Sequence, residues 1–327
     1  MSSDIITSLA PMAGYTDAAF RRICSEMGAD YVVSEMISSM ALTMGDRKTA
    51  DLAKIHPGEA PVILQVFGHD PKVVARSVEI LLTGNYPGCS YAAPPAGIDI
   101  NLGCPVKKIT SNGEGSALMK NIPLAREITA AAAEACAKYG VPLSVKHRLG
   151  WDSDSVIAAE FAYEMAKAGA SRITLHTRTR EQMYAPSASP EACRETAERL
   201  RELNVPLVGN GDIETIEDAK VYLAMGCSEV SVGRAALGNP WLFRQMKDPD
   251  SFTPPSLEEV IALVSRFVTQ LVQEKGETVG IRESRGRAAY FIRGMRGSAK
   301  IRDRLNHCTG LKEFLTILES TTLEQQV

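Results

Sequence analysis

Short apolar runs recur between residues 6 and 233, and a longer segment of helical character follows each of them. Runs rich in Val, Ile and Leu that are bounded by Gly, Pro and polar residues predict buried β-strands. Residues 123–139 and 155–168, which are rich in alanine and glutamate, favour helices. Eight strands are predicted in this way: residues 6–13, 31–35, 62–67, 98–101, 143–147, 172–176, 206–210 and 229–233.

Strands that alternate with helices are typical of a parallel sheet with crossover helices. Eight such units over about 240 residues match a (β/α)8 barrel in size. A doubly wound open sheet is the alternative. No GxGxxG segment follows the first strand, which weakens that alternative. We therefore predict an α/β barrel.

A smaller helical domain is predicted after the barrel. Residues 247–255 are polar and rich in proline, as in a linker. Ser256 and Glu259 form a capping box for a helix over residues 257–275, and Gly276 is a plausible end for it. The apolar face of that helix consists of Val260, Leu263, Val264, Phe267, Leu271 and Val272. We assign residues 1–246 to the barrel, 247–255 to the linker and 256–327 to an all-α domain.

Positive charge concentrates in this second domain. Residues 275–304 carry nine Lys or Arg against three acidic residues, a local charge of +6 in a chain whose total is −3. A continuous helix over residues 282–304 would leave Ala288, Phe291, Ile292, Met295 and Ala299 on a core face. Six cations would form a second stripe on the same helix. Because the rest of the chain is acidic, this stripe suits a phosphate backbone better than a general surface, and a solvated basic face is the alternative. The stripe comprises Arg282, Arg285, Arg293, Arg296, Lys300 and Arg304.

Composition narrows the class of protein. The apolar fraction of 45% and charged fraction of 23% are ordinary for a globular chain, and no run of apolar residues is long enough to span a membrane. The N-terminus lacks the pattern of a secretory signal. The seven cysteines are scattered without a CxxC pair, which favours neither a disulfide framework nor a zinc site. We expect a cytoplasmic protein with no membrane segment and no metal.

Polar residues stand at the carboxyl ends of the predicted strands, where barrels bind their ligands. Cys104 follows the strand 98–101 and is held by Pro105, beside the amide of Asn101. Considered alone, Cys104 could equally be a small buried hydrophobe, Gln65 a solvated loop residue and His176 a core histidine. A lysine within an apolar strand is harder to explain without a partner. The residues that converge are Pro11, Met12, Ala13, Gln65, Asn101, Cys104, Lys146, His176, Asn210, Gly211, Asp212, Gly233 and Arg234.

Seven motifs, in order, resemble the tRNA-dihydrouridine synthase family. They are APMAGYTD at 10–17, NLGCP at 101–105, GSAL at 115–118, RLGW at 148–151, HTRTR at 176–180, NGD at 210–212 and GRAALGNP at 233–240. The resemblance runs from about residue 8 to 245 and more loosely to about 310. It implies an FMN-binding TIM barrel followed by a small helical domain. Residues 84–97 look like an insertion before the catalytic strand, and we expect no catalytic role for them.

The resemblance also implies roles for single residues. Pro11, Met12 and Ala13 would lie along the flavin, and Gln65 and Lys146 would bind the edge of its ring. Cys104 would be the catalytic residue. His176 would help to fix the cofactor, and its phosphate would be held by Asn210, Gly211, Asp212, Gly233 and Arg234. Asn101, Arg178 and Tyr184 would lie near the target uracil.

The implied reaction is reduction of the C5=C6 bond of uridine in tRNA, with NADPH as reductant, FMN as hydride carrier and Cys104 as proton donor. An ordinary thiol has a pKa of about 8.5 and keeps its proton near neutral pH, as an acid must. We expect a monomer whose partners are tRNA and NAD(P)H. Two alternatives are an FMN barrel that reduces a small molecule and a catalytically idle RNA-binding barrel. Flavin colour would exclude the idle barrel, and the basic second domain argues against a small-molecule reductase.

Overall fold

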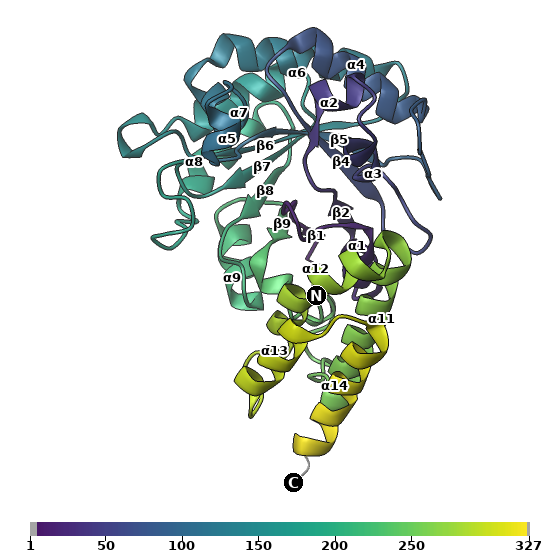
Figure 1. The fold of residues 1–327 in the computed structure, drawn as a ribbon. Helices are drawn as coiled ribbons and strands as arrows, with labels where there is room; N and C mark the ends of the chain where they lie inside the picture. Colours follow the sequence, from purple (N-terminus) through teal and green to yellow (C-terminus); the bar gives the residue numbers. More distant parts are fainter. Residues whose placement is uncertain (1–4, 326–327) are drawn as a thin grey trace. The chain divides into compact units, whose positions relative to one another are not determined.

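The computed structural model describes residues 5–325, and it forms two compact units, Met1–Gly233 and Arg234–Val327. The first unit is an α/β barrel (Figure 1). Its strands are β1 (Thr7–Leu9), β2 (Tyr31–Val33), β3 (Ile37–Ser38), β4 (Val62–Phe67), β5 (Gly97–Leu102), β6 (Leu143–Arg148), β7 (Arg172–His176), β8 (Leu207–Asn210) and β9 (Glu229–Val232).

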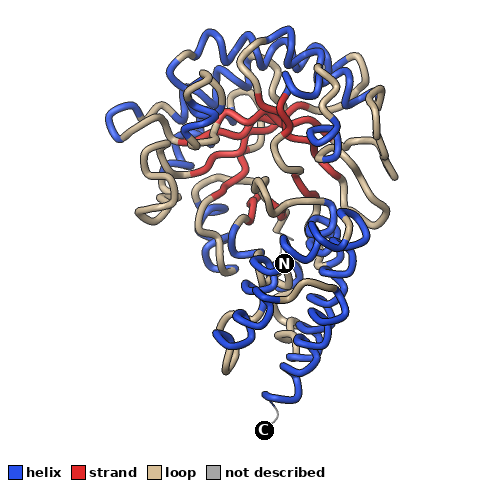
Figure 2. Tube along the Cα trace, viewed as in Figure 1, coloured by secondary structure: helices blue, strands red, loops and turns tan. Residues whose placement is uncertain are grey.

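The strands close into a parallel barrel. Every strand pair is parallel, in the order β2-β1-β9-β8-β7-β6-β5-β4, and β2 pairs with β4 to complete the ring. Figure 2 shows these strands grouped inside a layer of helices. The predicted (β/α)8 barrel is confirmed, and the open sheet is excluded by the closure. The short β3, which follows β2 and pairs with the last residues of β4, was not predicted.

The helices of the barrel begin and end at residues suited to those positions. Asp70 accepts hydrogen bonds from the amides of Lys72 and Val73, Pro71 takes the first position of α4, and Gly84 ends that helix at φ 65°. The helices are α1 (Ala18–Glu26), α2 (Ser39–Thr43), α3 (Arg47–Asp51), α4 (Pro71–Thr83), α5 (Lys107–Thr110), α6 (Ile122–Ala137), α7 (Ala158–Lys167), α8 (Ala192–Arg201) and α9 (Ile216–Ala224), with 3₁₀ turns η1 (Gly115–Lys120) and η2 (Ser153–Ser155).

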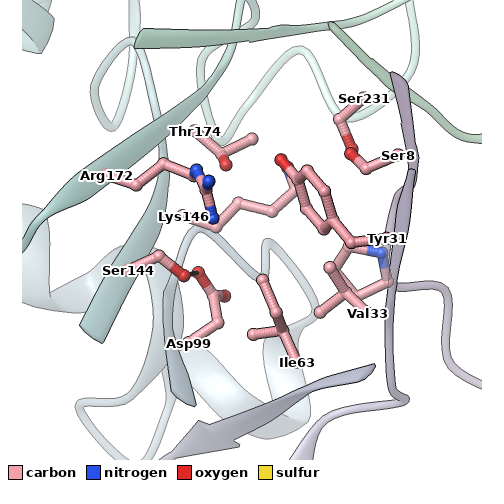
Figure 3. Close-up of a pocket in the computed structure, with 11 residues that line it drawn as sticks. Ser8, Tyr31, Val33, Ile63, Asp99, Ser144, Lys146, Arg172, Thr174 and Ser231 are labelled. Carbon is pink, nitrogen blue, oxygen red and sulfur yellow. Dashed lines mark hydrogen bonds between the residues drawn. The ribbon is translucent and has the colours of Figure 1, made fainter. Parts of the chain in front are cut away.

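The interior of the barrel is polar toward the amino ends of its strands. Tyr31 donates a hydrogen bond of 2.7 Å to Glu229, which also pairs with Arg172. The guanidinium of Arg172 stacks on the Tyr31 ring, and Lys146 reaches toward the same space (Figure 3). The small cavity that these side chains line has room for about one water molecule. Buried charges of this kind persist only when they are paired.

The second unit is helical, as predicted. It contains η3 (Arg234–Ala236), α10 (Leu242–Lys247), α11 (Leu257–Lys275), α12 (Glu277–Phe291), α13 (Ser298–His307) and α14 (Leu311–Gln325). The helix predicted over 257–275 is confirmed, with Ser256 and Glu259 in a reciprocal capping box. Its predicted face is buried at Leu263, Val264, Phe267 and Leu271. The predicted limits of the barrel, linker and helical domain remain our proposal.

The continuous helix over residues 282–304 that a single cationic stripe would require does not form. The chain leaves α12 after Phe291 and enters α13 at Ser298. Gly294 and Gly297 adopt φ of 85° and 72°, which an unbroken right-handed helix does not permit. The two helices therefore have independent faces. Ala299, which we assigned to the core face, is exposed.

Candidate active site

The barrel register brings the predicted polar residues to one end. Asn101 on β5 lies beside Lys146 on β6, and His176 on β7 lies beside Asn210 on β8. Gln65 on β4 lies beside Asp99 on β5, one pleat below Asn101 on the same face. Cys104 follows the end of β5. Seven strands therefore contribute to one carboxyl-end mouth, since Met12 follows β1 and Gly233 follows β9.

The loop after β1 is held in place by its own hydrogen bonds. The amide of Met12 donates to Thr16 Oγ1 at 3.0 Å, and the Met12 carbonyl accepts from the amides of Tyr15 and Thr16. Gly14 adopts φ 80° and donates its amide hydrogen to the Glu35 carboxylate. Pro11 and Met12 remain half-buried, and Ala13 is exposed. This loop is a fixed apolar strip at the edge of the mouth.

Lys146 provides a cation at the mouth. Its Nζ donates to Asn210 Oδ1 at 2.8 Å, and Asn210 Nδ2 donates to the Ser231 carbonyl at 2.7 Å. The pKa of Lys146 falls to about 7, mainly because burial disfavours the charged form and secondarily because of Arg148; Asp99 opposes the shift. An anion bound nearby would favour the charged form. The site can therefore respond to negative charge that develops in the mouth.

Cys104 is fixed through its backbone and half-buried. Its amide donates to Asn101 Oδ1 at 2.8 Å, and its carbonyl accepts from the Ser116 hydroxyl at 2.9 Å. A side chain at Gly115 would come within 2.9 Å of that carbonyl, so only glycine allows the approach. Burial raises the pKa of the thiol, against smaller opposing effects of the Val106 amide and the Arg148 charge. Cys104 is therefore a protonated thiol at neutral pH.

Arg148 braces the loops around Cys104. Its Nε donates to the Gly103 carbonyl at 2.9 Å, and Nη1 donates to the carbonyls of Thr179 and Met183, each at 2.9 Å. Its guanidinium lies 5.9 Å from the ring centre of Tyr184. Burial lowers the pKa of Arg148 to about 10, so it stays charged at neutral pH. Sequence reasoning gave this residue no role, although it ends a strand within a motif.

Arg178, which we expected near the substrate, is buried and bonded within the protein. It pairs with Asp212, donates from Nε to the Pro186 carbonyl at 2.7 Å, and approaches His176 Nε2 at 3.3 Å. Asp212 also accepts from the Ala188 amide at 3.0 Å. These contacts tie the loop after β7 to the loop after β8. Tyr184 lies in the same loop and is 54% exposed, so its ring is available to a ligand.

The turns after β8 and β9 differ in the space around their glycines. Gly211 has φ 133°, and a Cβ there would lie 2.8 Å from Ala188 Cβ. A Cβ at Gly233 would instead make ordinary van der Waals contacts, with Met12 Sδ at 3.8 Å and Ala10 Cβ at 3.9 Å. Gly233 thus lies against the strip after β1 and is half-buried. Arg234 belongs to the second compact unit.

The cations predicted to bind phosphate do not form one stripe. Arg282, Arg293, Arg296 and Lys300 are exposed, and they are distributed over α12, α13 and the turn between them. Arg285 and Arg304 are half-buried and bonded within this unit, to the Cys308 carbonyl and to Ser320 Oγ. The exposed cations therefore lie on three separate segments and not on one face of a continuous helix.

Two expected absences concern metals and membranes. Among residues 5–321, whose side chains the structure describes, His, Cys, Asp and Glu nowhere gather in a group of three or more that could hold a metal ion. No helix in the same part of the chain is both long and apolar enough to cross a membrane.

Comparison with known proteins gives one family. The family model described as "Dihydrouridine synthase (Dus)" matches residues 8–327. A protein of Pasteurella multocida named "tRNA-dihydrouridine synthase B" is 34% identical over 317 residues, 95% of this chain and 91% of its own length. A "Probable tRNA-dihydrouridine synthase" of Treponema pallidum is 32% identical over 94% of this chain and 91% of its own length. The Pseudomonas aeruginosa "tRNA-dihydrouridine synthase B" is 33% identical over 94% and 91%.

Proposed function

The chain belongs to the dihydrouridine synthase family, as the sequence motifs indicated, and from this premise we propose that it is a tRNA-dihydrouridine synthase. It would be an oxidoreductase that saturates the C5=C6 bond of specific uridines in tRNA. The observation that carries the proposal is the position of Cys104, fixed at the barrel mouth beside the strand that bears Lys146. We further propose that it works as a cytoplasmic monomer.

The residues at the mouth suit FMN. Lys146 offers a cation, and residues 11–13 offer an apolar strip beside Gly233. Gln65, our other candidate for the ring edge, already bonds Asp99 and Asn101 through its amide. His176, Asn210, Gly211, Asp212, Gly233 and Arg234 are our candidates to hold the ribityl phosphate end. The fit is least obvious at Asp212, a carboxylate engaged by Arg178. When bound and reduced by NADPH, FMN supplies a hydride to C6 of the uracil.

Cys104 would complete the reduction by donating its proton to C5. One hydride and one proton then saturate the bond, and the resulting thiolate is reprotonated from solvent. A raised pKa suits this role, because the thiol must arrive protonated and a nucleophilic cysteine would need a lowered value. The nearby charge of Arg148 would stabilise the thiolate once it forms.

The target base must leave its stack to reach the mouth. We propose that Asn101, Arg178 and Tyr184 line its pocket: the exposed Tyr184 ring can stack on a base, while Arg178 shapes the loop that carries it. The exposed cations of the helical unit, Arg282, Arg293, Arg296 and Lys300, would contact phosphates of the same tRNA. Arg285 and Arg304 would mainly support that surface.

The proposal is tested by mapping dihydrouridine in tRNA from cells with and without the gene. We expect one or more uridine positions to gain two hydrogens only when the gene is present, and the purified protein to be yellow. Identical tRNA maps, or a protein that binds no flavin, would contradict the proposal.

A further inference from the structure

A line of buried polar side chains leads from the barrel interior to Cys104. Asp99 Oδ2 accepts from Gln65 Nε2 at 2.7 Å, and Gln65 Oε1 accepts from Asn101 Nδ2 at 2.9 Å. Asn101 Oδ1 then accepts from the amides of Gly103 and Cys104, at 3.1 and 2.8 Å. Asp99 and Gln65 are 3% and 1% exposed, so water does not compete for these bonds. Three residues on two neighbouring strands thus form one directional chain of hydrogen bonds, which ends at the backbone amides of Gly103 and Cys104.

The direction of this chain of hydrogen bonds depends on its first member, Asp99. An amide group can turn over and exchange its donor for its acceptor, so Gln65 and Asn101 could both reverse together. An ionised carboxylate only accepts, which forces Gln65 to point its NH₂ inward and its oxygen outward. Asn101 must then direct its own NH₂ to Gln65 and its oxygen to the Cys104 amide. Reversal would place an NH₂ against two backbone N–H groups.

The contacts of Asp99 are those of a hydrogen-bond acceptor, although burial outweighs them and raises its pKa overall. Burial raises the pKa of Asp99, and hydrogen bonds from Ser144 and Gln65 oppose that shift, as do the charges of Lys146 and Arg172. Ser144 Oγ donates to the second carboxylate oxygen at 2.6 Å. Figure 3 shows Asp99 and Ser144 directed toward one another from adjacent strands. Both carboxylate oxygens therefore accept a hydrogen bond.

We propose that Asp99 is a positioning residue for Cys104, which acts by fixing the amide orientations of Gln65 and Asn101. The proposal rests on the acid role proposed for Cys104, and it adds the residue that sets where the thiol stands. A small error in the placement of a reacting group can cost about 100-fold in rate. The alternative is that Asp99 only fills the polar core.

The first test measures hydrogen exchange at the amides of Gly103 and Cys104 by NMR or mass spectrometry of the flavin-loaded protein. Asp99→Leu should raise the exchange of both amides by about tenfold, the order of one broken hydrogen bond. Asp99→Asn should restore protection, because its oxygen can still accept from Gln65 while its NH₂ faces Ser144. Ser144→Ala is the matched control: it removes the other partner of Asp99 and should leave both amides protected.

The second test measures the two half-reactions in the same proteins. Asp99→Leu should slow the tRNA-dependent step by about 10- to 100-fold while leaving reduction of the cofactor by NADPH near normal. A residue that only supports the fold would slow both steps and raise exchange throughout the barrel, for example in β8. That pattern, or unchanged protection at Gly103 and Cys104, would overturn the proposal.

A second variant and a separate readout allow the proposal for Asp99 to be tested even if Asp99→Leu does not fold. If Asp99→Leu does not fold, Gln65→Met interrupts the same chain one step later without a change in charge and should expose the same two amides. The exchange measurement does not depend on dihydrouridine formation. A wild-type protein that makes no dihydrouridine would contradict the proposed function, whereas the exchange pattern alone decides whether Asp99 positions Cys104.

Discussion

Cations occur in two very different settings in this molecule. At the barrel mouth, Lys146, Arg148 and Arg178 are enclosed, and each holds named oxygen atoms of the protein. In the helical unit, Arg293 and Arg296 are exposed to solvent. An enclosed charge loses hydration and must be matched by fixed partners, so it sets geometry and responds to nearby protonation. An exposed charge keeps its hydration and acts on other polyions at a distance, in a way that salt screens.

The difference suggests a division of work. The enclosed cations fix the loops around the mouth and shift the pKa of the Cys104 thiol, and they can stabilise a bound anion. These are the properties that catalysis requires. The exposed cations are suited to neutralise phosphates, and they would therefore contribute to the affinity for tRNA. The two regions should therefore fail in different ways when they are changed.

The largest effect is expected for Cys104→Ala. The variant should keep its flavin and its oxidation of NADPH, and its dihydrouridine formation should fall by about 10²–10⁴-fold, the usual contribution of a general acid. Cys89→Ala is a matched control, since Cys89 is also half-buried and precedes β5 at the other end of the barrel. Equal impairment of both variants, or near-normal activity of Cys104→Ala, would remove Cys104 from the mechanism.

The next effect is expected for Lys146→Ala. Removal of a cationic hydrogen-bond donor to the flavin ring should weaken flavin affinity by about 10- to 100-fold, and turnover should fall because the negative charge of the reduced ring loses its partner. Titration of the flavin-free protein with FMN measures the affinity. Lys220→Ala on the exposed face of α9 is the control and should behave as wild type. A Lys146→Ala protein with unchanged flavin affinity and activity would contradict the assignment of Lys146.

A smaller effect is expected for the double change of Arg293 and Arg296 to Ala. The Michaelis constant for tRNA should rise, and the salt dependence of binding should flatten by about 0.7–0.9 log unit per tenfold salt for each phosphate that is no longer neutralised. Reduction of the cofactor by NADPH should not change. The exposed Lys72 and Lys220, replaced together, provide the control. Identical slopes for wild type and the Arg double variant would mean that these arginines form only a solvated face.

The smallest effect concerns pH. Because burial raises the pKa of Cys104, the thiol should keep its proton to a higher pH than an ordinary cysteine, whose pKa is about 8.5. Alkylation of Cys104, followed by peptide mass spectrometry, should therefore be slow at neutral pH and still be rising above a pH of about 8.5. A rate that reaches its plateau at neutral pH would show a lowered pKa and would favour a nucleophilic role instead.

The strands of the barrel could be predicted because each is a buried apolar run with clear ends. The ranges 62–67 and 172–176 agree with β4 and β7, and the others differ by a few residues at their ends. Strand β3 has two residues and no pattern long enough to be recognised. The segment 84–97 indeed begins at Gly84 and leads into the amino end of β5, where the Tyr91 hydroxyl donates to the Leu81 carbonyl.

The cationic stripe could not be predicted, because it depended on one helix continuing through two glycines. Gly294 and Gly297 adopt positive φ, and tertiary packing rather than spacing then decides which arginines are exposed. The side chains around Cys104 were partly visible in the sequence. Asp99 shares the face of Asn101 by alternation, yet its link to Gln65 depends on strand register, which motifs do not contain.

The division of work between the two regions is tested most directly by the rate of dihydrouridine formation as a function of tRNA concentration. We predict that the variant with Ala at 293 and 296 recovers the wild-type rate once tRNA is saturating, because only its affinity is lowered. Cys104→Ala should stay inactive at every tRNA concentration while its cofactor is still reduced by NADPH. The account would be contradicted if Cys104→Ala regained dihydrouridine formation at high tRNA concentration. It would also be contradicted if the arginine variant had a maximal rate well below that of the wild type.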